Sequence, residues 1–421
     1  MTTHRTKTFL LGLMIGLAVP GFAEEQESGG TGTPPSAPTA ETQVAPDTSA
    51  KVTIDGAAGA VSVDGKTYFM FAIRPELAME PWGVGLDLRI LWNDDGVRKE
   101  DFDELRDIAN FIRYIRYGKK GQTVYTRLGV LDDTTLGYGL TVRRYSNGIS
   151  TAFDKTFGMD VSLDGGLVGI EGFGNDIAIW RLFGGRVFLR PLNWSGIPVF
   201  DAMQIGVYAV KDRDPGIGAT PLTAYGADIG VPLIKSDVVS MTVFAETSML
   251  DGRGSGYTAP GITGKVLMFD YKFEMRNYAA NFIPSLFDWN YEGRRPINWT
   301  LPQYASTNPR VSGWLGEIGW TWEGMLKVGG YFEQPTGQNA TVHAEATLLA
   351  DFIPKVKSAS ISYDQKDVKT LSLNDPNTLV TARAGIEMTP GAILYLTVRQ
   401  TYDALTAKFI RTTTMETRIK L

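Results

Sequence analysis

Acidic and basic side chains occupy every second position of part of the stretch 264–277, at Asp270, Lys272, Glu274 and Arg276, with mostly apolar residues between them. A repeat of two is the repeat of a β-strand, because successive side chains point to opposite faces of the strand. One face of this strand is therefore charged and the other is apolar. Strands of this kind, closed into a barrel, would place mixed charges along a wet interior, where such charges select ions and polar solutes.

Charged residues also follow the polar positions of other predicted strands. The segment 131–148 adds charges of both signs, and Gly137 and Gly139 permit tight bends within it. We expect this segment to fold inward as a constriction; the alternative is an ordinary strand and turn with solvated charges. The predicted pore-lining residues are Arg89, Arg113, Arg116, Arg127, Asp132, Asp133, Arg143, Arg144, Asp270, Lys272, Glu274, Arg276, Arg383, Glu387 and Arg399. A plugged interior filled with ion pairs is the alternative to an open pore.

The chain lacks the residues that several other kinds of functional site require. The chain has no cysteine and only two histidines, His4 and His343. His343 has Glu345 beside it on the polar positions of a predicted strand, which is too few ligands for a metal site. No motif for phosphate or dinucleotide binding is present. We expect no catalysis, no metal and no cofactor, and the net charge of −5 gives no basic excess for nucleic acid.

The N-terminal region indicates export. Basic residues precede an apolar run at 9–19, and Gly21 and Ala23 form a small-x-small cleavage site. The apolar run is shorter than the roughly 20 residues that a spanning helix requires. We therefore predict a cleaved signal peptide at 1–23, a disordered linker at 24–50 and an extension or plug segment at 51–65. The predicted β-barrel covers 66–421.

Strand-like alternation recurs through this last region, and no internal repeat is visible. Tight turns alternate with long loops, among them 251–262, 278–311 and 365–377, and a short amphipathic helix is predicted within 97–110. Aromatic residues cluster near predicted strand ends, as expected at the two interfaces of a membrane. An even strand number is expected for such a barrel. We predict about 16 strands, in a range of 14 to 18.

The final predicted strand, 406–421, resembles the C-terminal strand of bacterial outer-membrane β-barrels. Met415 and Ile419 share one face, and Glu416 and Arg418 share the other. Leu421 departs from the aromatic residue that usually ends such strands. The resemblance is to porin-like proteins at the level of architecture. It implies an all-β, transmembrane, antiparallel up-and-down barrel in the outer membrane, contact with lipopolysaccharide, and recognition of the last strand by the barrel assembly machinery.

Three functions follow as hypotheses from this architecture. We expect a porin-like channel for passive diffusion of small solutes, compatible with a homo-oligomer. One alternative is a transporter for hydrophobic substrates, with a plug at 51–65 and a lateral opening marked by Pro75 or Pro232. Another is a non-conducting structural, adhesive or receptor barrel that displays 278–311. A soluble secreted β-sandwich is the alternative fold, because alternation alone does not distinguish lipid from a protein core.

Overall fold

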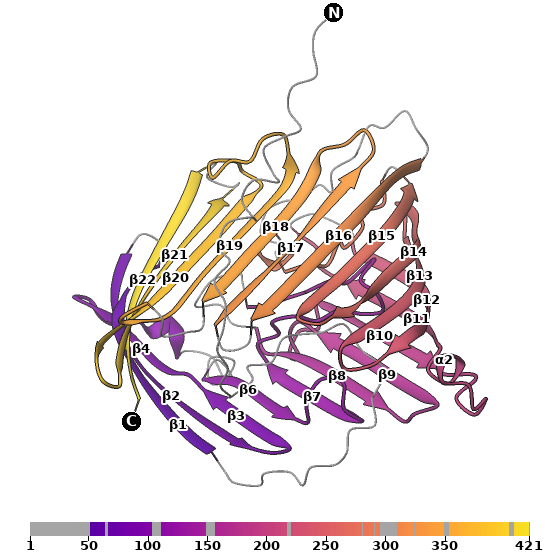
Figure 1. Cartoon of the computed structure of the whole chain (residues 1–421). Helices are drawn as coiled ribbons and strands as arrows, with labels where there is room; N and C mark the ends of the chain where they lie inside the picture. Colours follow the sequence, from indigo (N-terminus) through magenta and orange to yellow (C-terminus); the bar gives the residue numbers. More distant parts are fainter. Residues whose placement is uncertain are drawn as a thin grey trace, which may run out of the picture. The chain divides into compact units, whose positions relative to one another are not determined.

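The computed structural model describes residues 51–63, 66–102, 111–148, 156–216, 220–279, 281–289, 291–294, 310–322, 325–348, 353–403 and 408–420. The predicted signal peptide and linker lie outside the described residues. All the described strands belong to one sheet, in which every ladder is antiparallel (Figure 1). No helix in the described part of the chain is long and apolar enough to cross a membrane.

The strand segments run in chain order as follows: β1 Lys51–Val63, β2 Lys66–Met79, β3 Trp82–Leu86, β4 Leu88–Asn93, β5 Gly96–Val97, β6 Ile112–Tyr117, β7 Val124–Gly129, β8 Gly158–Asp164, β9 Val168–Gly174, β10 Leu182–Leu189, β11 Gln204–Asp212, β12 Leu222–Lys235, β13 Val239–Leu250, β14 Gly254–Val266, β15 Phe269–Ala279, β16 Arg310–Trp322, β17 Leu326–Pro335, β18 Ala340–Leu348, β19 Val356–Val368, β20 Thr378–Thr389, β21 Ala392–Asp403 and β22 Lys408–Lys420.

The ladder closes on itself. Each wall strand pairs with its neighbours in sequence, and β22 pairs back to β1 through Asp55 opposite Lys420. β3 and β4 both pair with β2 and form one wall strand interrupted at Asp87, and the two-residue β5 pairs only with the end of β4. The 22 segments of the described residues therefore make 20 wall strands. Every wall strand thus pairs on both sides over at least part of its length, with β1 and β22 paired over Asp55 to Ala60. A sheet that crosses a bilayer has to be closed in this way.

The predicted number of 16 strands was too low. The segment predicted as an extension or plug forms β1, and the segment predicted as the loop 251–262 forms most of β14. Both strands are rich in Gly and Ala or Thr, so their sequences do not alternate visibly between apolar and polar residues. Similarly, the predicted strand at 264–277 is divided by a turn at Leu267 and Met268, which separates β14 from β15.

The two faces of the wall differ in exposure. On β15, Phe273 and Met275 are exposed on the outer face, while Glu274 and Arg276 are buried on the inner face. On β4, Ile90 is likewise exposed beside buried Leu91. This alternation confirms the predicted apolar outer face and polar inner face. An exposed apolar band of this kind fits lipid rather than water.

Connections differ between the two ends of the barrel. At one end, here called the turn end, the connections between β8 and β9, β12 and β13, β14 and β15, and β20 and β21 have two or three residues. The other end, here called the loop end, carries the long connections that follow β7 and β15. Three short helices are described: η1 Lys99–Asp101, α2 Pro198–Asp201 and α3 Tyr291–Arg294. Only η1 falls within the helix predicted at 97–110, whose residues 103–110 lie outside the described ones.

Candidate functional site

Two connections from the loop end meet inside the barrel and pair with each other. The first, 130–148, follows β7, and the second, 281–294, follows β15. Arg143 donates its backbone N–H to the Phe287 carbonyl at 3.0 Å, and Phe287 donates to the Thr141 carbonyl at 3.1 Å. The two segments thus continue backbone pairing within the interior. We call them the inner loops.

Apolar side chains pack the inner loops against one sector of the wall. Leu140 and Val142 are fully buried, and so is Phe287 of the second loop. The wall contributes residues from β9 to β16, including Phe173, Tyr208, Val210, Leu222, Leu250, Tyr278 and Val311. Burying one such aliphatic or aromatic side chain contributes roughly 1.5–3 kcal/mol. The inner loops therefore fill this sector of the wall as a packed core. We call it the packed sector.

Buried polar groups fix where the loops attach. Asn147, which is fully buried, accepts a hydrogen bond from the Leu131 backbone at 2.7 Å and donates to the Asn175 carbonyl at 2.9 Å. Glu246 of β13 accepts from the Leu140 backbone at 3.0 Å and from the Tyr208 hydroxyl at 2.8 Å. Because a buried donor or acceptor is costly when unpaired, these contacts select one position for the loops.

One edge of the first inner loop carries charges towards the strands β16 to β18. Arg143 pairs with Glu317 at 2.5 Å and lies over the Tyr331 ring, with 4.4 Å to its centroid. Arg144 pairs with Glu345 at 3.2 Å. Basic residues of the loop therefore face acidic residues of the wall at this point.

Burial changes the ionisation of this loop edge. Desolvation raises the pKa of Asp133, and the nearby charges of Arg144 and Lys120 oppose that rise. For Arg144, burial disfavours the cation, but the carboxylates of Glu345 and Asp133 outweigh it and raise the pKa. Arg144 therefore stays cationic, whereas Asp133 is the group on this edge that takes up a proton more readily than an ordinary aspartate.

A second sector of the wall, formed by β20 to β22, β2 to β4, β6 and β7, bears most of the arginines predicted to line a pore. Five of its arginines have acidic partners: Arg74 with Asp87 and Glu416, Arg113 with Glu76, Arg116 with Glu80, Arg127 with Asp132, and Arg418 with Glu416. A register shift between Gly85 and Leu86, opposite Arg113, lets both Arg113 and Tyr114 reach Glu76. We call this the arginine sector.

Two arginines at inward positions of this sector have no acidic partner among the described residues. Arg383 of β20 and Arg399 of β21 make no hydrogen bond there, and the Nε of each is buried and unpaired. Arg383 lies over the Tyr395 ring, with 4.2 Å to its centroid. Arg399 faces Thr381, two residues from Arg383, across the β20–β21 ladder. Unpaired guanidinium groups in this arrangement offer donors to an anion.

The two sectors differ in their access to water. In the packed sector, the side chains of Arg276 and Asp228 have no exposed area. In the arginine sector, the side chain of Glu76 is 36% exposed, and that of Asp132, on the first inner loop, is 64% exposed. The side chains of Arg74, Asp87 and Glu416 in the same sector are at most 11% exposed. Inward charges with as much accessible surface as Glu76 and Asp132 require open space beside them. The interior thus contains a packed part and, beside Glu76 and Asp132, a part that water can enter.

No family model and no curated protein matches this chain. Among solved structures, OpdL of Pseudomonas aeruginosa is 10% identical, with 89% of this chain and 99% of that chain covered and a TM-score of 0.31. OprD of the same organism is 9% identical, with 88% and 95% covered and a TM-score of 0.34. A mutant of the Rh. blastica porin is 12% identical, with 89% and 100% covered and a TM-score of 0.28.

The remaining predicted pore-lining residues fall in both sectors. Lys272 and Glu274 pair with each other at 2.5 Å, and Glu274 also pairs with Arg276 at 2.6 Å. These belong to the packed sector of the barrel, together with Arg143. Glu387 pairs with Lys357 at 3.1 Å. Arg89 is partly buried on the inner face of β4, and Asp270 lies opposite Lys265 at the turn end of β15.

Sequence reasoning missed the buried charges of β10 to β13. Arg186 forms two hydrogen bonds to Asp228, at 2.8 and 2.6 Å, and a third to Glu171 at 3.1 Å. Asp228 and Glu246 both occupy inward positions of strands that alternate clearly in the sequence. Their position on the polar face was the available signal, and applying the same rule to these strands would have found them.

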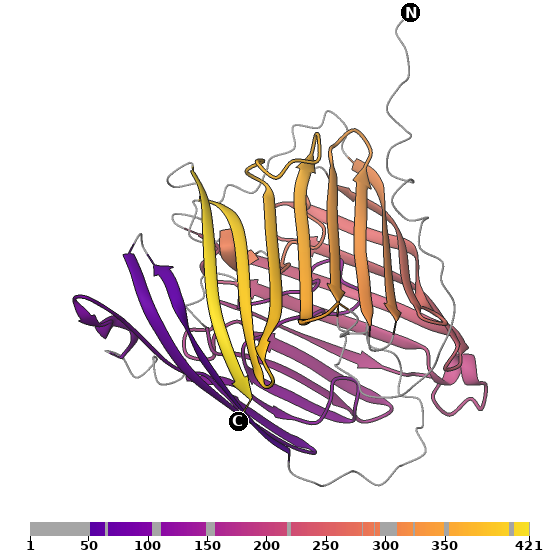
Figure 2. The ribbon, with the colours of Figure 1, turned by 60° about the vertical axis from the view of Figure 1, so that its left-hand side comes forward.

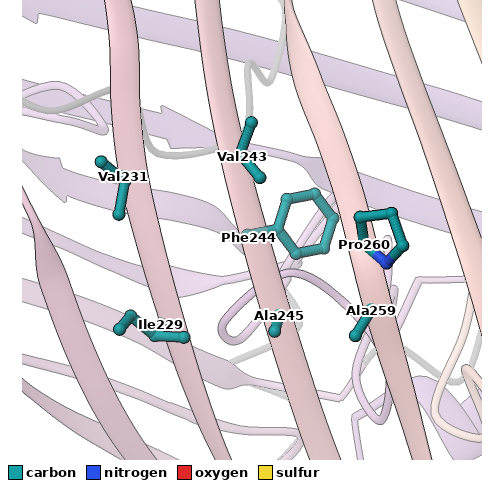
Figure 3. A pocket seen from close by; sticks show the side chains of 7 residues that line it. All are labelled: Ile229, Val231, Val243, Phe244, Ala245, Ala259 and Pro260. Carbon is teal, nitrogen blue, oxygen red and sulfur yellow. The ribbon is translucent and has the colours of Figure 1, made fainter.

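A groove on the outer face of the barrel bears on the hydrophobic-transport alternative. It measures about 440 Å³ and is lined by side chains of β12, β13 and β14, among them Ile229, Val243 and Pro260 (Figure 3). The pairing register shifts here, between Thr258 and Gly261. On the inner side, the Phe244 ring stacks on Tyr138 of the inner loop at 4.0 Å. The stacked rings close the wall behind the groove.

Proposed function

We propose that this chain is an outer-membrane channel through which small solutes diffuse passively along the arginine sector, with a preference for anions. The contrast in exposure between the packed sector and the arginine sector is the observation that carries this proposal. A closed barrel with an apolar exterior suits a membrane, and open space beside inward charges suits water-borne solutes.

The anion preference follows from the charge balance of the arginine sector. Its carboxylates are engaged by neighbouring arginines, whereas Arg383 and Arg399 have no acidic partner in the described chain. A fixed positive potential in a confined space raises the local concentration of anions. Recognition by two guanidinium groups suits a carboxylate or another oxyanion. A related chemistry is named for one matched structure, Pseudomonas aeruginosa OccK2, which was solved in complex with glucuronate.

We further propose that the chain has a cleaved signal peptide at 1–23 and a linker at 24–50. We also propose that its last strand directs assembly and that the barrel contacts lipopolysaccharide. The chain would act without catalysis. The transporter for hydrophobic substrates remains a second candidate because of the groove over β12 to β14, but Phe244 and Tyr138 would have to separate before a substrate could pass.

Conductance in planar bilayers tests the channel proposal. We expect discrete openings and, in a salt gradient, a reversal potential of the sign that anion permeation gives. The double variant Arg383→Gln/Arg399→Gln should shift that potential towards cations. Lys369→Gln removes one positive charge at an exposed loop position and serves as control. Silence across many insertions of correctly folded protein would contradict conduction, and an unchanged reversal potential in the double variant would contradict the role of these arginines.

A further inference from the structure

One connection at the turn end differs from its neighbours in length and composition. Residues 190–203 join β10 to β11 and include α2, whereas no other connection at this end exceeds seven residues. The ten residues 191–200 contain no charged side chain. Four large apolar side chains are exposed there, namely Leu192, Trp194, Ile197 and Phe200. We call this connection the apolar connection.

The apolar connection is held in shape by hydrogen bonds at its base and across it. Arg190 donates to Asp164 at 2.6 Å and to the Gly166 carbonyl at 2.7 Å, which ties the base to the neighbouring turn. Asp201 accepts from the Ser195 hydroxyl at 2.7 Å and from the Gly196 backbone at 3.1 Å. The connection therefore presents its apolar side chains on a preformed scaffold, so little conformational entropy is lost when they are covered.

This surface continues the apolar outer face of the wall. Figures 1 and 2 show α2 at the outer side of the ladder, beside the ends of β10 and β11. Leu189 and Ile205, the outward residues that flank the connection on these two strands, are both exposed. Trp194 is 71% exposed, far more than the neighbouring wall residues. A large amphipathic ring at the rim of an apolar band is typical of the interface between lipid and water.

We propose that the apolar connection is a membrane anchor, in which Trp194, Ile197 and Phe200 enter the headgroup region of the bilayer at the turn end. A lipid surface fits because the exposed side chains are apolar, the exposed segment lacks charge, and the patch is continuous with the lipid-facing band. The inference rests on the proposed membrane location of the barrel, and it does not depend on conduction. Its effect would be to fix the depth and tilt of this side of the barrel.

The absence of cysteine from the chain makes a site-specific test direct. Single variants Trp194→Cys, Val207→Cys and Asp237→Cys carry one environment-sensitive fluorophore each, in full-length protein reconstituted into phosphatidylcholine–phosphatidylglycerol vesicles. Val207 is 59% exposed on the outer face of β11 and reports the membrane location itself. Asp237 is exposed in the short turn between β12 and β13, at the same end as Trp194, and reports the aqueous phase.

We expect the label at 194 to be quenched by nitroxide lipids that carry the nitroxide near the headgroup, and to be several-fold less quenched by aqueous iodide than the label at 237. Equal iodide quenching at 194 and 237, with lipid quenching at 207, would overturn the anchor while leaving the membrane location intact. Absence of lipid quenching at 207 would instead overturn the location. Protection of 194 only at a high protein-to-lipid ratio would indicate a second copy and would also overturn the anchor. Folding is checked for each variant by heat-modifiable electrophoretic mobility.

Discussion

The backbone N–H of Leu140 donates a hydrogen bond to the Glu246 carboxylate across 3.0 Å, and so joins an inner loop to the wall of β13. The same carboxylate accepts from Tyr208 at 2.8 Å. Glu246 is buried and has two donors but no cation within ion-pair distance among the described residues. Glu246 is therefore one of the wall side chains that fix the position of the first inner loop.

Replacing Glu246 should release that loop. In Glu246→Ala the Leu140 N–H and the Tyr208 hydroxyl lose their acceptor, and an unsatisfied buried donor costs about 1–3 kcal/mol. We expect lower thermal stability and a larger, noisier single-channel conductance. Glu246→Gln keeps an acceptor oxygen. Its thermal stability and conductance should lie between those of Glu246→Ala and those of the native protein. Native conductance in Glu246→Ala would show that the remaining contacts of the loop hold it in place without Glu246.

A methyl group at Gly230 should disturb the same loop from the wall side. A Cβ at this position would collide with the Tyr138 ring and hydroxyl. We expect Gly230→Ala to displace Tyr138 from Phe244, to lose roughly 0.5–1.5 kcal/mol of ring stacking, and to raise conductance. Gly172→Ala is the matched control, since its Cβ would lie at an ordinary 3.5 Å from the Gly184 carbonyl. Identical conductance in the two variants would argue against a role for the stacked rings.

Closure of the barrel should depend on Arg74. This β2 side chain pairs with Asp87 at 2.8 Å and with Glu416 of β22 at 2.5 Å, and it is only 10% exposed. Arg74→Met leaves both carboxylates without this partner, and removing one member of a buried ion pair costs about 3–5 kcal/mol. We expect a lower temperature for the loss of the compact electrophoretic form. Lys66→Met, which breaks an exposed 4.0 Å pair with Asp95, should lower the free energy of unfolding by at most about 1 kcal/mol. The transition temperature should therefore change little.

Mild acid should strengthen the anion preference through Asp133. Because burial raises its pKa, this carboxyl loses its charge at a higher pH than an ordinary aspartate. The protonated form is also favoured by folding, so its contribution to stability is present at low pH and is lost as the pH rises through the folded-state pKa. Asp133→Asn should show the acid-form selectivity already at neutral pH and lack the mild-acid step in reversal potential. Asp132→Asn, at an exposed neighbouring position, should retain that step.

The strands of the wall could be predicted from the sequence where successive side chains alternate between apolar and charged residues. In β15, aromatic and charged residues mark the two faces clearly, and the structure confirms both. In β1, the run Gly56 to Ala60 contains only Gly and Ala, and small side chains give no signal of which face meets lipid. In β14, Gly254, Pro260 and Thr263 have the composition of a loop, and only pairing with β13 and β15 makes the segment a strand. Long-range pairing thus overrode local composition.

The interior was predictable in its residue types but not in its contacts. The charges of Arg143 and Arg144 pointed to a constriction, yet their partners Glu317 and Glu345 lie 174 and 201 residues away. Alternation assigns a residue to the inner face and leaves open which inner residue it meets across the barrel. The pairing of the two inner loops had no sequence signal, because it uses backbone groups of Thr141, Arg143 and Phe287.

The pairing of the inner loops also constrains the order in which the molecule can form. The first loop follows β7, but Glu246 and Phe287, which hold it, belong to β13 and to the segment after β15. Contacts between such distant parts of a chain form slowly, because a long segment must be brought together first. The first inner loop therefore waits, with Leu140 and Val142 uncovered, until 13 of the 20 wall strands have been added. Its apolar residues need protection from contact with other chains during that time.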